Sequence, residues 1–210
     1  MEALDICIAE KIDVVNMSLG TPKISLVVEQ KIEEAVMAGV ALVVAAGNSG
    51  GAVQFPASSP NALAVSAIGS TQTLQPNTFD ASQVTRDLTM AHGIFSPLFS
   101  CHGPEVNVTA PGVAIISTGP NGTFFPDSGT SMAAPHVTGL AAILIAQHPA
   151  FSTRFANRDY HRVFALYDLL RKISVPLELG RERTGFGMPQ LNAIIQELLV
   201  EEDQQASETT

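Results

Sequence analysis

The sequence predicts an α/β fold in which a mostly parallel central sheet is covered by helices on both faces. Two observations predict this fold. Short apolar runs rich in β-branched residues recur along the chain, as is typical of strands buried on both faces. Segments with helical spacing of apolar residues lie between these runs, as parallel strands require. With 210 residues, 46% of them hydrophobic, and a mean hydropathy of +0.23, the chain is long and apolar enough for one such domain.

The first half of the chain carries the regular part of the pattern. We expect a helix over residues 3–10, a buried strand over 12–20, a helix over 24–38, and strands over 40–46 and 63–68. Gly39 stands where a glycine commonly ends a helix. A helix that feeds a parallel strand crosses over from an earlier strand. We therefore expect a further strand upstream of residue 1.

The second half is less regular. Residues 70–92 are polar and predict a long surface loop. Beyond this loop, we expect short strands at 106–109 and 113–117, and helices at 129–147, 158–173 and 189–199. The first of these helices is rich in Ala, Leu and Ile, so it is predicted to be central and buried. Residues 200–210 are acidic and predict a solvated, disordered tail after a domain over residues 1–199.

Charge and cysteine content exclude several kinds of protein. Twenty acidic residues against 11 basic ones, without a basic patch, argue against a nucleic-acid partner. No run reaches the ~18 apolar residues of a membrane helix. Residues 1–5 are acidic, unlike the start of a signal peptide, so the sequence leaves the compartment open. Cys7 and Cys101 lie outside any CxxC motif, which favours two buried thiols over a disulfide.

One chemical signal lies at the start of the long apolar helix, in Gly129-Thr130-Ser131-Met132-Ala133-Ala134-Pro135-His136-Val137. Backbone N–H groups at a helix start have no internal partner, and the helix dipole favours negative charge there. An oxyanion formed when Ser131 attacks a carbonyl would therefore meet the Ser131 N–H. Taken alone, the segment favours the simpler interpretation that Ser131 is a helix N-cap.

A second signal is Asn48, in Ala45-Ala46-Gly47-Asn48-Ser49-Gly50. It directly follows a buried strand, at the sheet edge where open α/β folds hold their sites. A side-chain amide at that edge can donate a hydrogen bond to a developing oxyanion. The alternative is that Asn48 and its neighbouring glycines only form a turn.

Together these segments resemble the subtilisin-like serine peptidases, the S8 or subtilase family. The resemblance rests on the order and spacing of A-A-G-N and G-T-S-M-A-x-P-H, and it extends over most of the chain. The matching segments are residues 13–20, 43–48, 55–57, 63–67, 110–112, 129–137 and 185–187. It implies a three-layer subtilisin-like fold and an endopeptidase that cleaves protein or peptide substrates through a serine acyl-enzyme.

The resemblance assigns roles to matching positions. It implies that Ser131 is the nucleophile and that Asn48 is the oxyanion-hole amide. The segments Ser18-Leu19-Gly20 and Ala45-Ala46-Gly47 are implied to flank the primary specificity pocket and to hold the substrate in an extended conformation. His136, five residues beyond the serine, is implied to be a packing residue. No cofactor is expected: calcium is common in the family, but this sequence has no Asp-rich loop.

The acid and the base of the family are not found in this sequence. The family order is Asp, His, Ser, with the Asp in D-[ST]-G and the His in H-G-T-H, and neither motif occurs here. Asp13 belongs to a strand motif, and the spacing of His92 and His102 does not favour either as a base. His148 is expected at a helix end and His161 at the surface.

We therefore expect the acid and base in a missing N-terminal segment of the same domain. Without a base, a serine hydroxyl is a weak nucleophile, so the chain alone is predicted to lack useful activity. It is also predicted to fold poorly, because an apolar sheet edge would stay uncovered.

Three other interpretations remain open. The chain can be a non-catalytic subtilase-like binding module or one half of a split peptidase. An α/β-hydrolase needs its acid and then its histidine after the serine, and only Asp159 and His161 offer that order, two residues apart. A nucleotide site is disfavoured, because residues 47–51 supply neither G-x-G-x-x-G nor a P-loop lysine.

Overall fold

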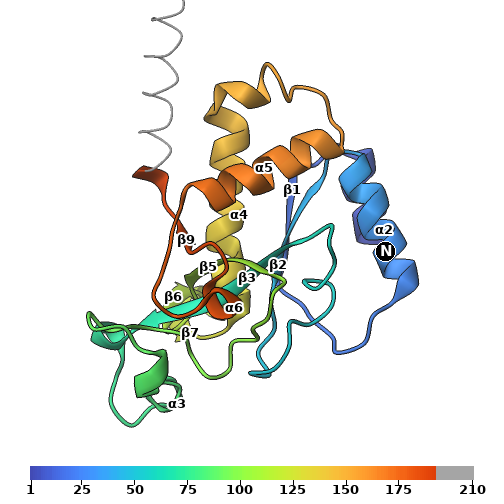
Figure 1. Cartoon of the computed structure of the whole chain (residues 1–210). Coiled ribbons are helices and arrows are strands. Elements are labelled where there is room, and N and C mark those ends of the chain that lie inside the picture. Colours follow the sequence, from blue (N-terminus) through green and yellow to red (C-terminus); the bar gives the residue numbers. More distant parts are fainter. Residues whose placement is uncertain (193–210) are drawn as a thin grey trace, which may run out of the picture.

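A mostly parallel sheet forms the centre of the computed structural model, which describes residues 1–192. Its parallel strands run in the order β1, β2, β3, β5, and β4 pairs antiparallel with the end of β3 (Figure 1). The bounds are β1 (Val14–Met17), β2 (Ala41–Ala45), β3 (Leu63–Ser70), β4 (Ile94–Phe95) and β5 (Val106–Pro111). The predicted α/β fold with a mostly parallel sheet is confirmed.

Helix α2 (Leu26–Met37) connects β1 to β2 and ends where the sequence predicts. Ser25 caps its first turn by accepting a hydrogen bond from the Val28 N–H. At the other end Gly39 has a φ of +80°. A Cβ at this position would also lie 2.8 Å from the backbone of Arg158, so both conformation and space require glycine.

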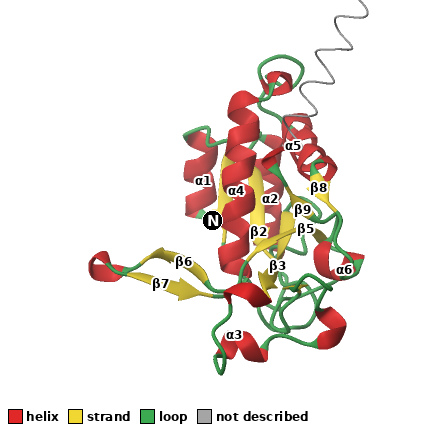
Figure 2. Cartoon of the chain, turned by 90° about the vertical axis from the view of Figure 1, so that its left-hand side faces the viewer, coloured by secondary structure: helices red, strands yellow, loops and turns green. Residues whose placement is uncertain are grey.

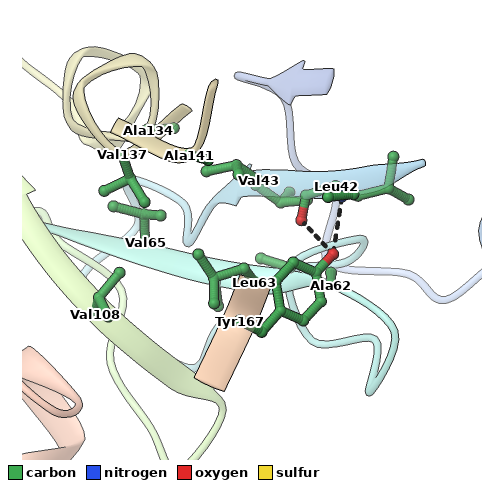
Figure 3. Close-up of a cluster of buried hydrophobic side chains, with 14 of the residues drawn as sticks. Leu42, Val43, Ala62, Leu63, Val65, Val108, Ala134, Val137, Ala141 and Tyr167 are labelled. Atoms are coloured by element: carbon green, nitrogen blue, oxygen red, sulfur yellow. Dashed lines mark hydrogen bonds between the residues drawn. The ribbon is translucent and has the colours of Figure 1, made fainter. Parts of the chain in front are cut away.

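Helix α4 (Thr130–Gln147) lies across one face of the sheet, with α2 on the opposite side (Figure 1). Its sheet-facing side is buried, and Val137 lies beside Val65 of β3 (Figure 3). The prediction of a central, buried helix holds only for this side, since Ile143 on the outer side is 45% exposed. The sheet covers only one side of α4, and Ile143 on the other side lines a groove together with Met188 and Pro189.

Strand β1 is partly exposed, which corrects the expectation of a buried strand over residues 12–20. It is shorter than expected and lies at the sheet edge, where β2 is its only partner among the described strands. Helix α1 (Glu2–Ala9), which precedes it, packs beside α2 and buries Leu4. The backbone on the outer edge of β1 is thus left without a strand partner within the described residues.

The region between β3 and α4 contains only short elements. The predicted irregular loop over 70–92 holds two 3-10 turns, η1 (Thr71–Thr73) and η2 (Arg86–Leu88), and the short helix α3 (Phe79–Ser82). Strand β6 (Ile115–Thr118) pairs with β7 (Phe124–Asp127) in a hairpin that projects from the body (Figure 2). The sequence did not predict β7, because a short segment that contains a proline is a weak strand signal.

The C-terminal part is built around α5 (Tyr160–Lys172), as predicted. Short elements complete it: η3 (Pro120–Gly122), η4 (Pro149–Phe151), β8 (Ser174–Val175), α6 (Arg181–Thr184) and β9 (Met188–Pro189). Most of the helix expected at 189–199, and the tail at 200–210, lie outside the described residues. Both cysteines are free, as predicted, although only Cys101 is fully buried. No helix within residues 1–192 is long and apolar enough to cross a membrane.

Tyr167 joins α5 to the centre of the sheet. Its ring is fully buried, and its hydroxyl accepts a hydrogen bond from the Leu42 N–H (2.8 Å) and lies 3.1 Å from the Leu42 carbonyl oxygen (Figure 3). Burial raises the pKa of Tyr167 well above its usual value of 10, because the phenolate would lose its water. The folded protein therefore holds Tyr167 neutral at pH values at which an unfolded chain ionises it.

This burial predicts a loss of stability at high pH. Between pH 10 and the raised pKa, only the unfolded state releases the Tyr167 proton, so the free energy of unfolding falls by about 1.4 kcal/mol per pH unit. Tyr167→Phe removes that contribution. It also costs about 1–3 kcal/mol at neutral pH, because the buried Leu42 N–H loses its acceptor. Urea unfolding of both proteins between pH 7 and pH 11.5 measures the difference; parallel pH curves would contradict the prediction.

Candidate active site

A cavity of about 340 Å³ lies where β1 and β2 end and α4 begins. Its lining consists of Ser18, Leu19, Gly20, Ala45, Gly47, Asn48, Ser49, Gln54, Thr130 and Ser131. Every residue predicted for the site lies in this lining except Ala46. That residue is fully buried, and its carbonyl accepts a hydrogen bond from the Gln54 N–H at 2.9 Å. Two segments some eighty residues apart thus line one cavity, one carrying Asn48 and the other Ser131.

Ser131 is the second residue of α4, not its cap. Gly129 occupies the N-cap position, so the N-cap interpretation of the serine is wrong. The Ser131 N–H is one of the helix donors without an intrahelical acceptor. Neither this N–H nor the Ser131 hydroxyl has a hydrogen-bond partner within the described part of the chain. Both groups are available to a ligand in the cavity.

The side chain of Asn48 is held in one orientation by Thr130. Its Oδ1 accepts hydrogen bonds from the Thr130 N–H (2.8 Å) and from the Thr130 hydroxyl (2.9 Å). The same hydroxyl accepts from the Gly47 N–H at 3.1 Å, so its own proton is free to donate to Asn48. Two donors can meet only the oxygen of the amide. The Nδ2 group of Asn48 is therefore turned away from Thr130 and can donate to another group.

Gly129 leaves the space that this amide needs. A Cβ at Gly129 would lie 3.1 Å from Asn48 Nδ2, which is tighter than an ordinary contact. The Gly129 N–H donates to the carbonyl of Gly112 at 2.8 Å, so the backbone here is fixed from the other side as well. The glycine of the G-T-S sequence thus allows the Asn48 amide to approach the start of the helix.

Ser18 connects the end of β1 to the candidate nucleophile. Pro135 has no N–H and cannot donate to the carbonyl of Ser131, four residues earlier in the helix. The Ser18 hydroxyl donates to that carbonyl instead, at 2.9 Å. Ser18 Oγ in turn accepts from Asn16 Nδ2 at 2.9 Å. The proline and the serine together fix the first turn of α4 against β1.

The comparisons with known proteins agree with this geometry. Residues 1–163 match the Subtilase family, Peptidase_S8. Subtilisin of Bacillus pumilus is 36% identical over 157 residues, which cover 72% of this chain and 49% of that protein. This chain belongs to the subtilase family. Subtilisin E of Bacillus subtilis (strain 168) is 34% identical over 157 residues, covering 72% of this chain and 35% of that protein. This subtilase chain therefore spans half or less of the length of these two relatives.

A solved structure with the same fold superimposes on most of this chain. The solved structure of the prenylagaramide maturation protease PagA superimposes with a TM-score of 0.67 over 94% of this chain and 65% of that one, at 24% sequence identity. The mixed α/β architecture of this subtilase chain is therefore the subtilisin-like fold.

No histidine in the chain is placed as a base for Ser131. All five lie within residues 1–192, and none is hydrogen-bonded to the serine. His136 is exposed rather than packed, with its Nδ1 2.8 Å from the Met132 carbonyl oxygen. His148 lies at the end of α4, as predicted; it is buried, and its Nδ1 accepts a hydrogen bond from the Ala150 N–H. His161 is exposed and stacks on Tyr160.

The acidic residues considered for other roles have structural ones. Asp13 forms ion pairs with Arg158 and Arg162, which tie the start of β1 to α5. Asp159 caps α5 by accepting from the Arg162 N–H at 3.1 Å. This removes the acid of the α/β-hydrolase interpretation. Across residues 1–192, no three His, Cys, Asp or Glu side chains are grouped so that they could hold a metal ion.

Sequence reasoning did not single out Ser49, Gln54 and Thr130 among the lining residues. Thr130 could have been found, because it lies inside the matching G-T-S sequence and a buried hydroxyl needs partners. Gln54 carried no local signal. It lies in the cavity because its N–H donates to the Ala46 carbonyl and because the next residue, Phe55, pairs with Thr21.

Proposed function

We propose that this chain supplies the nucleophile and the oxyanion-hole donors of a serine endopeptidase. One observation carries the proposal: the Ser131 hydroxyl shares a cavity with two donors, Asn48 Nδ2 and the Ser131 N–H, and none of the three has a hydrogen-bond partner within residues 1–192. The similarity to subtilisins supports the same reaction. The substrates are proteins or peptides, bound in an extended conformation between the segments at residues 18–20 and 45–47.

The chemistry follows from these groups. The Ser131 hydroxyl attacks the carbonyl carbon of the peptide bond, and the carbonyl oxygen becomes an oxyanion. The Asn48 amide and the Ser131 N–H donate to that oxygen and stabilise the transition state. The acyl-enzyme forms as the amine leaves with a proton, and water then releases the acid product. Both proton transfers need a general base that also acts as an acid.

We further propose that a segment outside this chain carries the histidine and aspartate. No hydrogen bond joins a described histidine side chain to Ser131, and D-[ST]-G and H-G-T-H do not occur in the sequence. The outer edge of β1, which has no strand partner among the described residues, supports this proposal, because it offers backbone groups to a further parallel strand directly beside Ser18. The exposed outer side of α4 gives the same segment an apolar surface on which to pack.

Labelling with a fluorophosphonate tests the proposal. The chain is joined to the N-terminal part of the Bacillus pumilus subtilisin, which brings the two motifs. We expect stoichiometric labelling of Ser131, loss of labelling in Ser131→Ala, and unchanged labelling in Ser49→Ala, which alters a neighbouring hydroxyl in the same cavity. Mass spectrometry locates the label. A folded fusion that binds peptides but is not labelled would support a non-catalytic binding module instead.

A further inference from the structure

We propose that Asn16 and Thr138 are positioning residues of the active site, because they direct the hydrogen bond that holds the carbonyl of Ser131. The inference rests on the proposed function and adds to it two residues that do not line the cavity. Asn16 belongs to β1, and Thr138 lies about two turns beyond the serine in α4. Both act through Ser18, whose hydroxyl donates to the Ser131 carbonyl at 2.9 Å.

The direction of each hydrogen bond follows from the Ser131 carbonyl. A carbonyl oxygen only accepts, so Ser18 donates its one proton there and accepts from the Asn16 Nδ2 amide at 2.9 Å. The Oδ1 of Asn16 then faces the Thr138 hydroxyl, which donates to it at 3.1 Å. The same hydroxyl lies 3.0 Å from the Ala134 carbonyl oxygen, so its proton is shared between two acceptors. One chain of hydrogen bonds thus runs from Thr138 to the candidate nucleophile.

The first turn of α4 depends on this chain because it lacks a backbone donor. Pro135 has no N–H, so no intrahelical hydrogen bond from that position reaches the Ser131 carbonyl. On the other side of the serine, the Thr130 N–H donates to Asn48 Oδ1 at 2.8 Å. The backbone around Ser131 is therefore held from β1 through its carbonyl and from the segment after β2 through the preceding N–H. Loss of the first contact leaves only the second to fix the position of the serine.

Ser18 needs Asn16 in order to keep its proton on the Ser131 carbonyl. Ser18 is exposed, so a hydroxyl without the Asn16 donor is free to turn its proton toward water. Asn16 is exposed as well, and the hydrogen bond from Thr138 selects the one amide orientation that presents Nδ2 to Ser18. A misplacement of about 1 Å at a reacting group costs about 10²-fold in rate. The expected effect of breaking the chain is therefore a lower kcat rather than weaker substrate binding.

Peptide hydrolysis by the fusion to the N-terminal part of the Bacillus pumilus subtilisin tests the inference. Thr138→Val keeps the shape of the side chain and removes its hydroxyl, whereas Asn16→Ala removes the amide. Each is expected to lower kcat by about 10–100-fold with little change in KM. Thr138→Ser retains the hydroxyl and should recover most of the lost kcat. In a Ser18→Ala background, Asn16→Ala should cost nothing further, because the chain is already broken.

A matched control separates positioning from stability. Ser174→Ala removes a hydrogen bond of the same kind at the end of α5, where the Ser174 hydroxyl donates to the Leu170 carbonyl at 2.7 Å. It should lower the free energy of unfolding, measured with urea, and leave kcat unchanged. Unchanged kcat in the folded Asn16→Ala and Thr138→Val fusions, or an undiminished effect of Asn16→Ala beside Ser18→Ala, would overturn the inference and leave the peptidase proposal intact. A folded fusion that neither reacts with the fluorophosphonate nor cleaves peptides would overturn both proposals.

Discussion

Supplying a general base is expected to raise the rate of peptide hydrolysis by this chain by about 10⁶, the magnitude known for removal of the triad serine or histidine in subtilisin. In this chain the Ser131 hydroxyl has no acceptor for its proton within residues 1–192. A neutral hydroxyl attacks an amide slowly. The oxyanion-hole donors and substrate binding alone leave about 10³–10⁴ over the reaction in water. The fusion to the N-terminal part of the Bacillus pumilus subtilisin provides the comparison.

The measurement is turnover of casein and of a chromogenic peptide amide by residues 1–210 alone and by the fusion. Ser131→Ala in the fusion should return the rate to that of the isolated chain, which shows that this serine performs the reaction. Circular dichroism checks that each protein is folded, because an open β1 edge exposes unpaired backbone groups. Robust casein turnover by the purified chain alone would show that a base within it had been overlooked.

The sequence predicted the position of the site better than its internal contacts. Ser131 and Asn48 could be placed because each begins or follows a strongly apolar element, and such elements determine where a parallel sheet ends. The turn at Gly39 was predicted for the same local reason. These features depend on residues within a few positions of each other, so a single sequence contains them.

Contacts between distant segments were not readable. Nothing near Ser18 indicates that its hydroxyl replaces the donor that Pro135 lacks, because this depends on β1 lying beside α4. Gln54 is likewise placed by its own backbone hydrogen bond to Ala46 and by the pairing of the next residue, Phe55, with Thr21. Burial was misjudged at β1 and on the outer side of α4, since apolar composition does not tell which faces a neighbouring element covers.

Asn48→Ala is expected to lower kcat in the completed enzyme by about 10²–10³, the effect known for loss of the corresponding amide donor in subtilisin. KM should change little, because the donor acts on an oxyanion that exists only along the reaction path. The alanine also removes the acceptor of two Thr130 hydrogen bonds, so it changes the structure as well as the chemistry.

Asn48→Asp is the sharper variant. A carboxylate oxygen can still accept both hydrogen bonds from Thr130, so the free energy of unfolding should stay close to that of the unaltered protein. The second oxygen replaces the Nδ2 donor, and its charge repels the oxyanion, so kcat should fall at least as far as in Asn48→Ala.

Thr130→Val is the matched control, which should lower stability and not remove the donor. The Asn48 amide remains, but the buried Gly47 N–H loses its acceptor, which costs about 1–3 kcal/mol of stability. Thr130→Ser keeps the hydroxyl, so it should lower neither kcat nor the free energy of unfolding. Full kcat in a well-folded Asn48→Asp fusion would mean that the amide does not donate to the reacting oxygen, and the Ser131 N–H would be the only one of the two proposed donors left to stabilise it.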